Sequence, residues 1–589
     1  MAEAIISPGV YTNESDQSAV SLGPVVVGAA IVGPTVDGIP YVPTVVTSYS
    51  DYTAKFGTTF NNGTNGANEY FTSLAAKNYF DNGGNTLLVT RITHAGTGSS
   101  ALQSFASASA PSSGSLATSF TLETLAWGAQ MNNLGGTVIS GALPSGSANN
   151  VRWEVSNVNY TQGTFTLLVR SGNDNQAQKN ILETWTNLSM DVNQPNYIAR
   201  VIGDNKPVYT YSSTDGQGYV DYAGNYPNAS RYIRVASVSQ AQYDTFNNNG
   251  IYQAATYSSS LPAPGSGSVN GAFNGGVVDT SLSRYMFEEI ISGVSNAQGF
   301  TTSDYAPALS LLNNTDEYQF NLLLAPGLFL AGGNSAINIG ANNADPISVA
   351  EGRADALAVV DTVPYGGTIT SAATAANASN SSYAATYWPW CQVFSSAMGK
   401  LVWVPASVVM GGVFAFTDEV SAPWFAPAGT TRGGIPNVIR VERKLSLNDR
   451  NTLYLDNVNP LATFPGEGVV VFGQKTLQQK ASALDRVNVR RLLIALKGYI
   501  SSVGRTLVFE QNTAATRNRF LNQVNPYLDS VVQKQGLYAY KVVMDESNNT
   551  PDVVDRNQLI GQIYIQPTKT AEFVILDFNI LPTGVEFPA

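Results

Sequence analysis

The two residue types that most often supply protein chemistry occur once each in this chain, as His94 and Cys391. A single histidine rules out a His-clustered metal site, and a structural zinc site would need more than one cysteine. His94 follows the apolar run LLVTRI at an expected strand end, but no Gly-x-Ser-x-Gly elbow accompanies it. Cys391 lies among aromatic residues in WPWCQVF, which favours an inert buried thiol. We therefore predict no enzymatic activity, no catalytic residue, no metal and no cofactor; an enzyme would have to depend on His94.

The charged residues with the most regular spacing lie in an expected helix at about residues 484–503. At about 100° per residue, its apolar positions form one stripe for a core; they are Val489, Leu492, Leu496, Tyr499, Ile500 and Val503. Arg486, Arg490 and Lys497 lie within about 40° of one another beside that stripe. Two interpretations stay open: a solvated face whose arginine stems cover apolar surface, or a basic ridge that docks on an acidic partner.

The overall composition excludes several classes of protein. Of the 589 residues only 12% are charged, 43% are hydrophobic, and the net charge is −11, so neither a disordered chain nor a nucleic-acid-binding protein is expected. From residue 432 onward the chain is basic, with 18 Lys+Arg against 14 Asp+Glu. No secretory signal and no membrane-spanning segment are expected, and the single cysteine suits a reducing cytoplasm.

Composition shifts along the chain predict five segments. They are an extended arm (1–24), an α/β segment (25–96), a β-rich, outward-facing insertion (97–275), an α/β core (276–430) and a C-terminal inner domain (431–589) ending in a second arm at about 581–589. The fold class expected from these segments is a multidomain α/β (α+β) protein.

Local patterns predict the elements that matter most for these segments. A buried strand is expected at 23–34, a helix followed by a strand at 67–92, and a hairpin at 151–170 around Gly163. In the C-terminal segment we expect a strand in RTLVFE, a second helix at about 517–534, and strands in LYAYKVVMDE, GQIYIQP and TKTAEFVILDFNI. The last of these strands is apolar on both faces, so it needs cover on both sides.

Six stretches, in order along the chain, resemble the tail sheath proteins of contractile-tailed bacteriophages. They are SPGVYTNE, VVTSYSDYTAKFG with AAKNYFDNGGNTLLVTRI, LETWTNLSMDVNQPNYIARVIGD, LVWVPASVVMGGVFAFTDEVSAPWFAPAGT, VNVRRLLIALKGYISSVGRTLVFEQNT and KTAEFVILDFNI. One stretch departs from the family: where many relatives read W-G-A-R-T-L, this chain has FGQKTLQ at residues 472–478. The role of that family arginine is therefore not carried over.

The resemblance implies a fold and a function. The fold is a subtilisin-like α/β sheath core with a β-rich surface insertion, an α+β C-terminal domain and extended arms at both ends, without proteolytic activity. The function is that of a structural subunit, which polymerises as stacked hexameric rings around a tail tube and contracts to drive the tube through the host envelope for genome delivery. The implied partners are further copies, the tail tube protein, and baseplate and tail terminator proteins, with no nucleic acid and no direct membrane insertion. The implied location is the virion tail sheath, assembled in the host cytoplasm.

The resemblance also implies two sets of contact residues. In the family, terminal arms add strands to the C-terminal domain of a neighbouring subunit; the matching residues here are Pro8, Gly9, Val10, Tyr11, Phe573, Ile575, Phe578, Val585 and Phe587. A charged contact with an acidic tube would hold the extended state and release on contraction, and we assign it to Arg486, Arg490, Arg491 and Lys497. A non-viral contractile injection system would use the same subunit design. A capsid or adhesin-type β-protein would lack an ordered α/β C-terminal domain.

Overall fold

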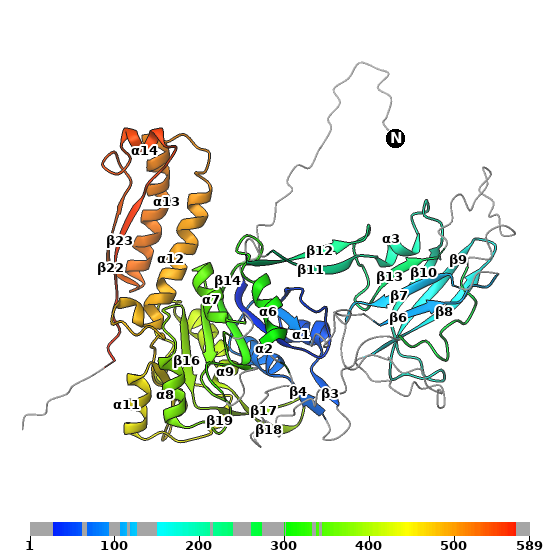
Figure 1. Cartoon of the computed structure of the whole chain (residues 1–589), viewed down its shortest axis with the longest axis horizontal. Helices are drawn as coiled ribbons and strands as arrows, with labels where there is room; N and C mark the ends of the chain where they lie inside the picture. Colours follow the sequence, from blue (N-terminus) through cyan, green and yellow to red (C-terminus); the bar gives the residue numbers. More distant parts are fainter. Residues whose placement is uncertain are drawn as a thin grey trace, which may run out of the picture.

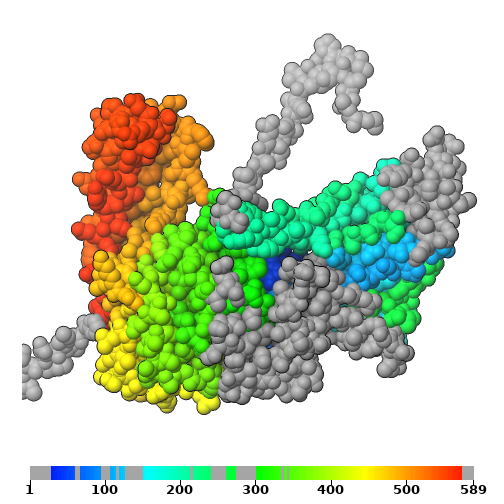
Figure 2. All heavy atoms as spheres, viewed as in Figure 1, coloured from blue at the N-terminus to red at the C-terminus, as the bar shows by residue number. Residues whose placement is uncertain are grey.

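The computed structural model describes residues 27–61, 67–93, 106–114, 118–126, 150–212, 216–239, 261–273, 300, 302–332, 337–340 and 344–572. A central α/β core lies between a β-rich insertion and a C-terminal domain built around two long helices (Figure 1). Both outer parts project from the core on opposite sides, as the space-filling view also shows (Figure 2). The predicted α/β multidomain class is confirmed.

The core is built on one eight-stranded sheet with the strand order β2-β5-β1-β14-β15-β16-β20-β21. Its strands are β1 (Val27–Pro34), β2 (Thr44–Val46), β5 (Leu87–Ile92), β14 (Phe320–Phe329), β15 (Leu357–Asp361), β16 (Ala384–Trp388), β20 (Val458–Phe464) and β21 (Gly468–Val471). From β5 to β20 all pairs are parallel, and β2 and β21 close the two edges antiparallel. Two strands beyond residue 431, β20 and β21, thus belong to this sheet, although the sequence analysis assigned 431–589 to the C-terminal domain.

Helices cover both faces of this sheet, which explains why β1 is apolar at every position. Ala29 and Ile31 pack on one face with α2 (Phe71–Asp81) and α9 (Ala406–Val420). Ala30 and Val32 pack on the other face with α6 (Thr302–Leu311). A strand buried on both faces is a continuous apolar run, so the buried strand and the helix–strand pair predicted for this region are confirmed.

The remaining core elements are shorter. They are α1 (Tyr49–Phe56), β3 (Thr59–Asn61), β4 (Ala67–Glu69), α7 (Pro346–Arg353), α8 (Ile369–Asn377), β17 (Cys391–Ser395), β18 (Lys400–Val404), α10 (Gly429–Arg432), β19 (Val438–Val441), α11 (Leu447–Leu455) and a 3-10 turn, η5 (Ala483–Asp485). Strands β18, β17 and β19 form a separate antiparallel sheet at the edge of the core. α11 packs beside α8 below the C-terminal domain (Figure 1).

The insertion consists of small antiparallel sheets around one apolar cluster. Its elements are β6 (Ser107–Ala110), β7 (Phe120–Thr124), β8 (Val151–Asn159), β9 (Thr164–Ser171), β10 (Ile181–Ser189), α3 (Ile198–Ile202), β11 (Lys206–Ser212), β12 (Gln217–Ala223) and β13 (Ile233–Val238). The predicted hairpin is confirmed as β8–β9, and Gly163 in its turn has φ 65°, a conformation that favours glycine. The β11–β12 ribbon extends from the insertion over the core (Figure 1), where the Tyr209 hydroxyl lies 2.8 Å from Ser310 Oγ on α6.

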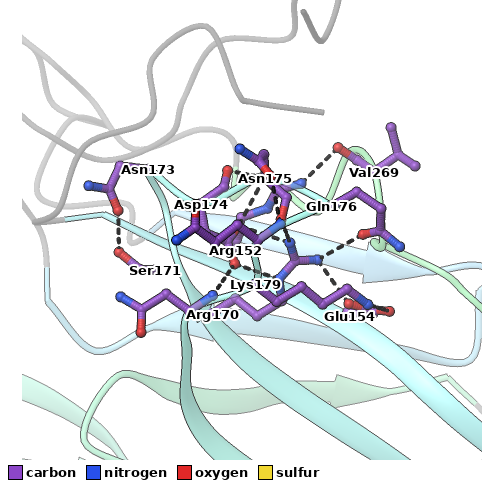
Figure 3. A network of polar contacts seen from close by, with 12 residues as sticks. Arg152, Glu154, Arg170, Ser171, Asn173, Asp174, Asn175, Gln176, Lys179 and Val269 are labelled. Atoms are coloured by element: carbon purple, nitrogen blue, oxygen red, sulfur yellow. Dashed lines mark hydrogen bonds and ion pairs between the residues drawn. The ribbon is translucent and has the colours of Figure 1, made fainter. Parts of the chain in front are cut away.

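A buried group of charges ties the β8–β9 hairpin to its flanking loops (Figure 3). The Arg170 guanidinium binds both oxygens of Asp174, at 2.8 and 2.9 Å, and Glu154 Oε2 at 2.8 Å. Arg152 binds Asp174 Oδ1 at 3.2 Å and donates to the Val269 carbonyl at 2.8 Å. The side chains of both arginines are fully buried. We call these residues, Arg152, Glu154, Arg170 and Asp174, the insertion charge cluster.

The C-terminal domain contains α12 (Val487–Arg505), α13 (Ala514–Gln533), β22 (Leu537–Val543), α14 (Pro551–Asp555) and β23 (Gln562–Pro567). The two predicted helices and the two strands β22 and β23 are confirmed. The strand predicted in RTLVFE is wrong, because these residues form the turn between α12 and α13. There Val508 and Phe509 are exposed and Phe509 has φ 68°, so the apolar run does not enter a sheet.

Both predicted arms lie outside the described residues, as do His94 and residues 573–580 of the predicted closing strand. Residues 568–572 of that predicted strand are described, and they are not in a β-strand. The arm candidates that fall there are Pro8, Gly9, Val10, Tyr11, Phe573, Ile575, Phe578, Val585 and Phe587. Among the helices that the structure describes, none is long and apolar enough to cross a membrane.

Candidate assembly surfaces at the C-terminal domain

The apolar stripe predicted for α12 packs against α13. Leu492, Leu496 and Val503 are nearly fully buried and share one cluster with Val524 and Leu528 of α13. Further along the pair, the rings of Tyr499 and Tyr527 stack with centroids 3.9 Å apart. An amphipathic helix gains most of its stability from such packing, so this stripe fixes how the other faces of α12 are oriented.

Arg490 lies on the face of α12 that contacts the core. Its guanidinium stacks on the Tyr383 ring at 3.9 Å from the centroid and donates from Nε to the Ser382 carbonyl at 3.1 Å. A second hydrogen bond from the same guanidinium reaches the Ser382 hydroxyl. Only 4% of the residue is exposed. Burial lowers the pKa of Arg490. The contacts of Arg490 join α12 to the segment that precedes β16.

Arg491 binds the core on a second side. Its two terminal nitrogens donate to the two oxygens of Asp418 on α9, at 2.7 and 2.6 Å, and its guanidinium lies 4.8 Å from the Phe414 ring centroid. The arginine side chain is 3% exposed, whereas that of Asp418 is 30% exposed. A bidentate arginine–carboxylate pair is geometrically specific, so this contact sets the angle between α12 and α9.

Arg486 and Lys497 differ from these two buried arginines. Arg486, at the N-terminal end of α12, binds the carboxylate of Glu572 through Nε at 2.6 Å and Nη2 at 3.0 Å. Lys497 is exposed, and its ammonium group lies 3.2 Å from the Tyr383 hydroxyl. The four residues predicted as one basic ridge therefore do not share one free surface.

The prediction of a basic docking ridge is wrong for Arg490 and Arg491, because their charges are buried and bound to the chain itself. The sequence predicted the helical face correctly but not what covers it. The partners Ser382 and Asp418 are far from α12 in the sequence, so the spacing of residues within the helix cannot predict them. We call the contacts of Arg490 and Arg491 the α12 joint, since they connect the C-terminal domain to the core.

The outer side of the C-terminal domain offers a different kind of surface. Strands β22 and β23 pair only with each other within the described residues, so each has a second edge with unpaired backbone groups. Tyr538 and Tyr564 on this hairpin are 66% and 57% exposed. An open edge with exposed large side chains can accept a strand from another chain.

The candidate chemical groups of the core have structural roles. Burial raises the pKa of the Cys391 thiol, which agrees with the predicted inert cysteine. Asp361, at the end of β15, accepts hydrogen bonds from the Ser407 backbone N–H at 2.9 Å and the Ser407 hydroxyl at 2.6 Å, at the start of α9. Burial raises the pKa of Asp361 to about 7 despite these bonds. In the described part of the chain, no cluster of His, Cys, Asp and Glu could hold a metal ion.

Comparisons with known proteins match two consecutive parts of the chain. A family model of the phage tail sheath protein central domain matches residues 298–477. A model of the phage tail sheath C-terminal domain matches residues 479–580. The boundary between them, at residue 478, follows β21 and precedes α12, so it separates the core sheet from the helical domain.

Curated relatives are tail sheath proteins of phages. The chain is 41% identical over 185 residues to the tail sheath protein of Vibrio phage KVP40, which is 31% of this chain and 28% of the relative. It is 40% identical over 185 residues to that of Enterobacteria phage T4, with the same two shares, 31% and 28%. The Salmonella phage ViI tail sheath protein is 35% identical over 198 residues, 34% of this chain and 31% of the relative. The matches thus span less than a third of these relatives' length.

Solved structures align along most of the chain at low identity. The helical sheath of the anti-feeding prophage in the contracted state gives a TM-score of 0.47 at 16% identity, covering 98% of this chain and 99% of that one. The sheath tail protein Lin1278 from Listeria innocua gives 0.49 at 10% identity, covering 92% and 95%. The predicted resemblance to phage tail sheath proteins is confirmed by the sequence matches: residues 298–477 and 479–580 match the models of the central and C-terminal domains.

Proposed function

We propose that this chain is the structural subunit of a contractile tail sheath. Copies would stack as hexameric rings around a tail tube and contract as a rigid-body rearrangement that drives the tube through a host envelope. The observation that carries the proposal is the unbroken succession of the two tail sheath domains over residues 298–580. The implied location is the virion tail, after assembly in the host cytoplasm.

The subunits would be joined by strand exchange at the β22–β23 hairpin. Its two open edges support this step, because isolated two-stranded hairpins are marginal and gain stability from additional strands. The arm candidates Pro8 to Tyr11 and Phe573 to Phe587 would supply those strands. Partners beyond further copies would be the tube protein, and baseplate and terminator proteins at the two ends of the sheath.

The core would then be the rigid body that moves during contraction. We assign it the subtilisin-like topology that the family resemblance implies, with residues 97–275 as an outward-facing insertion. The parallel β5–β20 strands, covered by helices on both faces, suit a rigid body.

Negative-stain microscopy of the purified full chain tests the proposal directly. We expect long hollow tubes, at a protein concentration and ionic strength found by screening. A chain that stays monomeric under every condition, while circular dichroism shows it to be folded, would contradict the sheath function. Closed shells in place of tubes would favour a capsid-type protein instead.

Removal of residues 581–589 tests the exchange step separately. We expect a folded monomer that no longer polymerises, because the terminal arm would be too short to complete a neighbour's sheet. Analytical ultracentrifugation gives the oligomeric state, and circular dichroism checks the fold. Tubes that form as readily as those of the full chain would exclude a joining role for this arm.

A further inference from the structure

The chain leaves the C-terminal hairpin by a short segment that returns to the core. β23 ends at Pro567, and the Thr568 backbone N–H still donates to the Gly536 carbonyl beside β22, at 3.2 Å. The following residues run down along the boundary between the C-terminal domain and the core (Figure 1). We call residues 568–572 the exit strap, because they follow the hairpin and precede the predicted C-terminal arm at about 581–589.

The exit strap ends in a carboxylate that three side chains from different elements bind. Glu572 accepts from Arg486 Nε at 2.6 Å and Nη2 at 3.0 Å, from the Tyr454 hydroxyl at 2.8 Å, and from Gln474 Nε2 at 3.1 Å. Tyr454 belongs to α11, Gln474 follows β21, and Arg486 caps the start of α12. Gln474 Nε2 also bonds to the Thr570 hydroxyl. One carboxylate thus connects the strap to both family domains.

The rest of the strap is held weakly. Lys569 and Ala571 are exposed, and one side of the strap borders a cavity of about 500 Å³ that Trp424, Phe472 and Tyr454 also line. The Glu572 side chain is 18% exposed. Burial alone would raise the pKa of Glu572, but the hydrogen bonds from Arg486, Tyr454 and Gln474 and the charge of Arg486 hold it below the usual range. Charge-assisted hydrogen bonds are the strong ones, so the attachment of the strap depends chiefly on Glu572.

We infer that Glu572 is the positioning residue of the C-terminal arm. Its contacts hold residue 572 at the boundary of core and C-terminal domain, and this position is the described start of the path to the arm predicted at about 581–589. A fixed departure point restricts where the arm can reach and therefore which neighbour it can join. This inference rests on the proposed function, in which the arm joins subunits.

The test compares Glu572→Gln with Glu546→Gln, the same change at an exposed residue of the same domain. Glutamine keeps the shape but loses the charge that binds Arg486. Hydrogen–deuterium exchange of the unpolymerised protein should show faster exchange of the strap in Glu572→Gln, by about tenfold for the loss of charge-assisted bonds. Glu546→Gln should exchange like the unchanged protein. Equal strap exchange in Glu572→Gln and the unchanged protein would overturn the inference.

Polymerisation then distinguishes positioning from mere local bonding. We expect Glu572→Gln to form fewer and shorter tubes than Glu546→Gln at the same concentration, although both variants fold. Tyr454→Phe, which removes one of the three donors, should change both readouts in the same direction but less. A faster-exchanging strap with unchanged tubes would show that Glu572 does not position the arm. If the unchanged protein forms no tubes at all, the proposed function fails, while the exchange comparison still decides whether Glu572 anchors the strap.

Discussion

Two groups of buried arginines in this molecule can be compared, because the first binds residues of one small unit and the second binds residues of another domain. In the insertion charge cluster, Arg170 binds Asp174 four residues away and Glu154 on the paired strand β8. In the α12 joint, Arg490 and Arg491 bind Ser382 and Asp418, which belong to the core. The first group holds one small unit together, whereas the second fixes two domains to each other.

This difference indicates which part of the structure each buried charge stabilises. Removing one partner of a buried pair leaves the other charge without compensation, which costs more than the pair itself contributes. In the insertion that penalty falls on local folding. In the α12 joint it falls on the orientation of a domain that would bear the contacts between subunits.

The largest effect is expected from Arg170→Ala. It leaves Asp174 and Glu154 buried with less compensation, and the free energy of unfolding of the insertion should fall by about 3–5 kcal/mol. Hydrogen–deuterium exchange should localise the change to the β8–β9–β10 sheet and leave α12 as it was. Arg231→Ala, an exposed arginine of the same insertion, serves as the control and should change little. Equal effects of the two variants would show that the cluster does not hold the insertion together.

The next effect is expected from Arg491→Ala. Because Asp418 is partly exposed and can be solvated, the expected loss is smaller, about 2 kcal/mol. Exchange should rise in α12 and α9 and not in the insertion. A double-mutant cycle with Asp418→Ala should show coupling between the two residues, and Arg505→Ala, exposed on the same helix, is the control. The losses of unfolding free energy in Arg491→Ala and Arg170→Ala should add in the double variant, since the two sites share no partner. A strongly non-additive loss would show that the two regions are not independent.

Arg490→Lys probes the shape of the joint rather than its charge. Lysine keeps the positive charge but cannot stack on Tyr383 as a planar group or form the fork of hydrogen bonds to Ser382. The free energy of unfolding of the C-terminal domain should fall by about 1 kcal/mol. Chemical denaturation followed by the exchange of α12 measures it. A lysine that leaves stability unchanged would mean that charge alone suffices at this position.

Acid should weaken the attachment of the exit strap through Glu572. The pKa of this carboxyl is lowered in the folded protein, so its contribution is fully present above the ordinary glutamate pKa of 4.5 and is lost as the pH falls through the folded pKa. Exchange of the exit strap should therefore rise at pH values below about 4.5. In Glu572→Gln this rise should be absent. A strap whose exchange rises equally with acid in both proteins would place the titrating group elsewhere.

The sequence predicted secondary structure in these regions better than it predicted the contacts between distant residues, for physical reasons. Apolar periodicity was sufficient for β1, α2, the β8–β9 hairpin and α12, because each period reports burial on one or two faces. The run RTLVFE has the composition of a strand, but it connects two packed antiparallel helices, and that tertiary requirement overrode its β propensity. The wheel placed Arg490 beside the apolar stripe of α12 correctly. It could not reveal that the core covers this face, since Ser382 and Asp418 enter only through the fold.

The smallest effect on stability is expected from Lys497→Glu. This variant compares an exposed cation of α12 with the buried arginines of the α12 joint. Lys497 is exposed, and no carboxylate partner of its charge is described; Arg490 also lacks a described carboxylate partner, but its guanidinium is buried. Reversal of the Lys497 charge should change the free energy of unfolding by no more than about 0.5 kcal/mol, as for most surface substitutions. If the residue contacts an acidic tube, co-assembly with the tube protein should nevertheless weaken, and more strongly at low salt, because surface charges are screened beyond about 10 Å. Co-sedimentation at two ionic strengths, with Lys444→Glu at an exposed position of the core as the control, separates the two effects. Unchanged co-assembly would exclude a role for Lys497 at the tube.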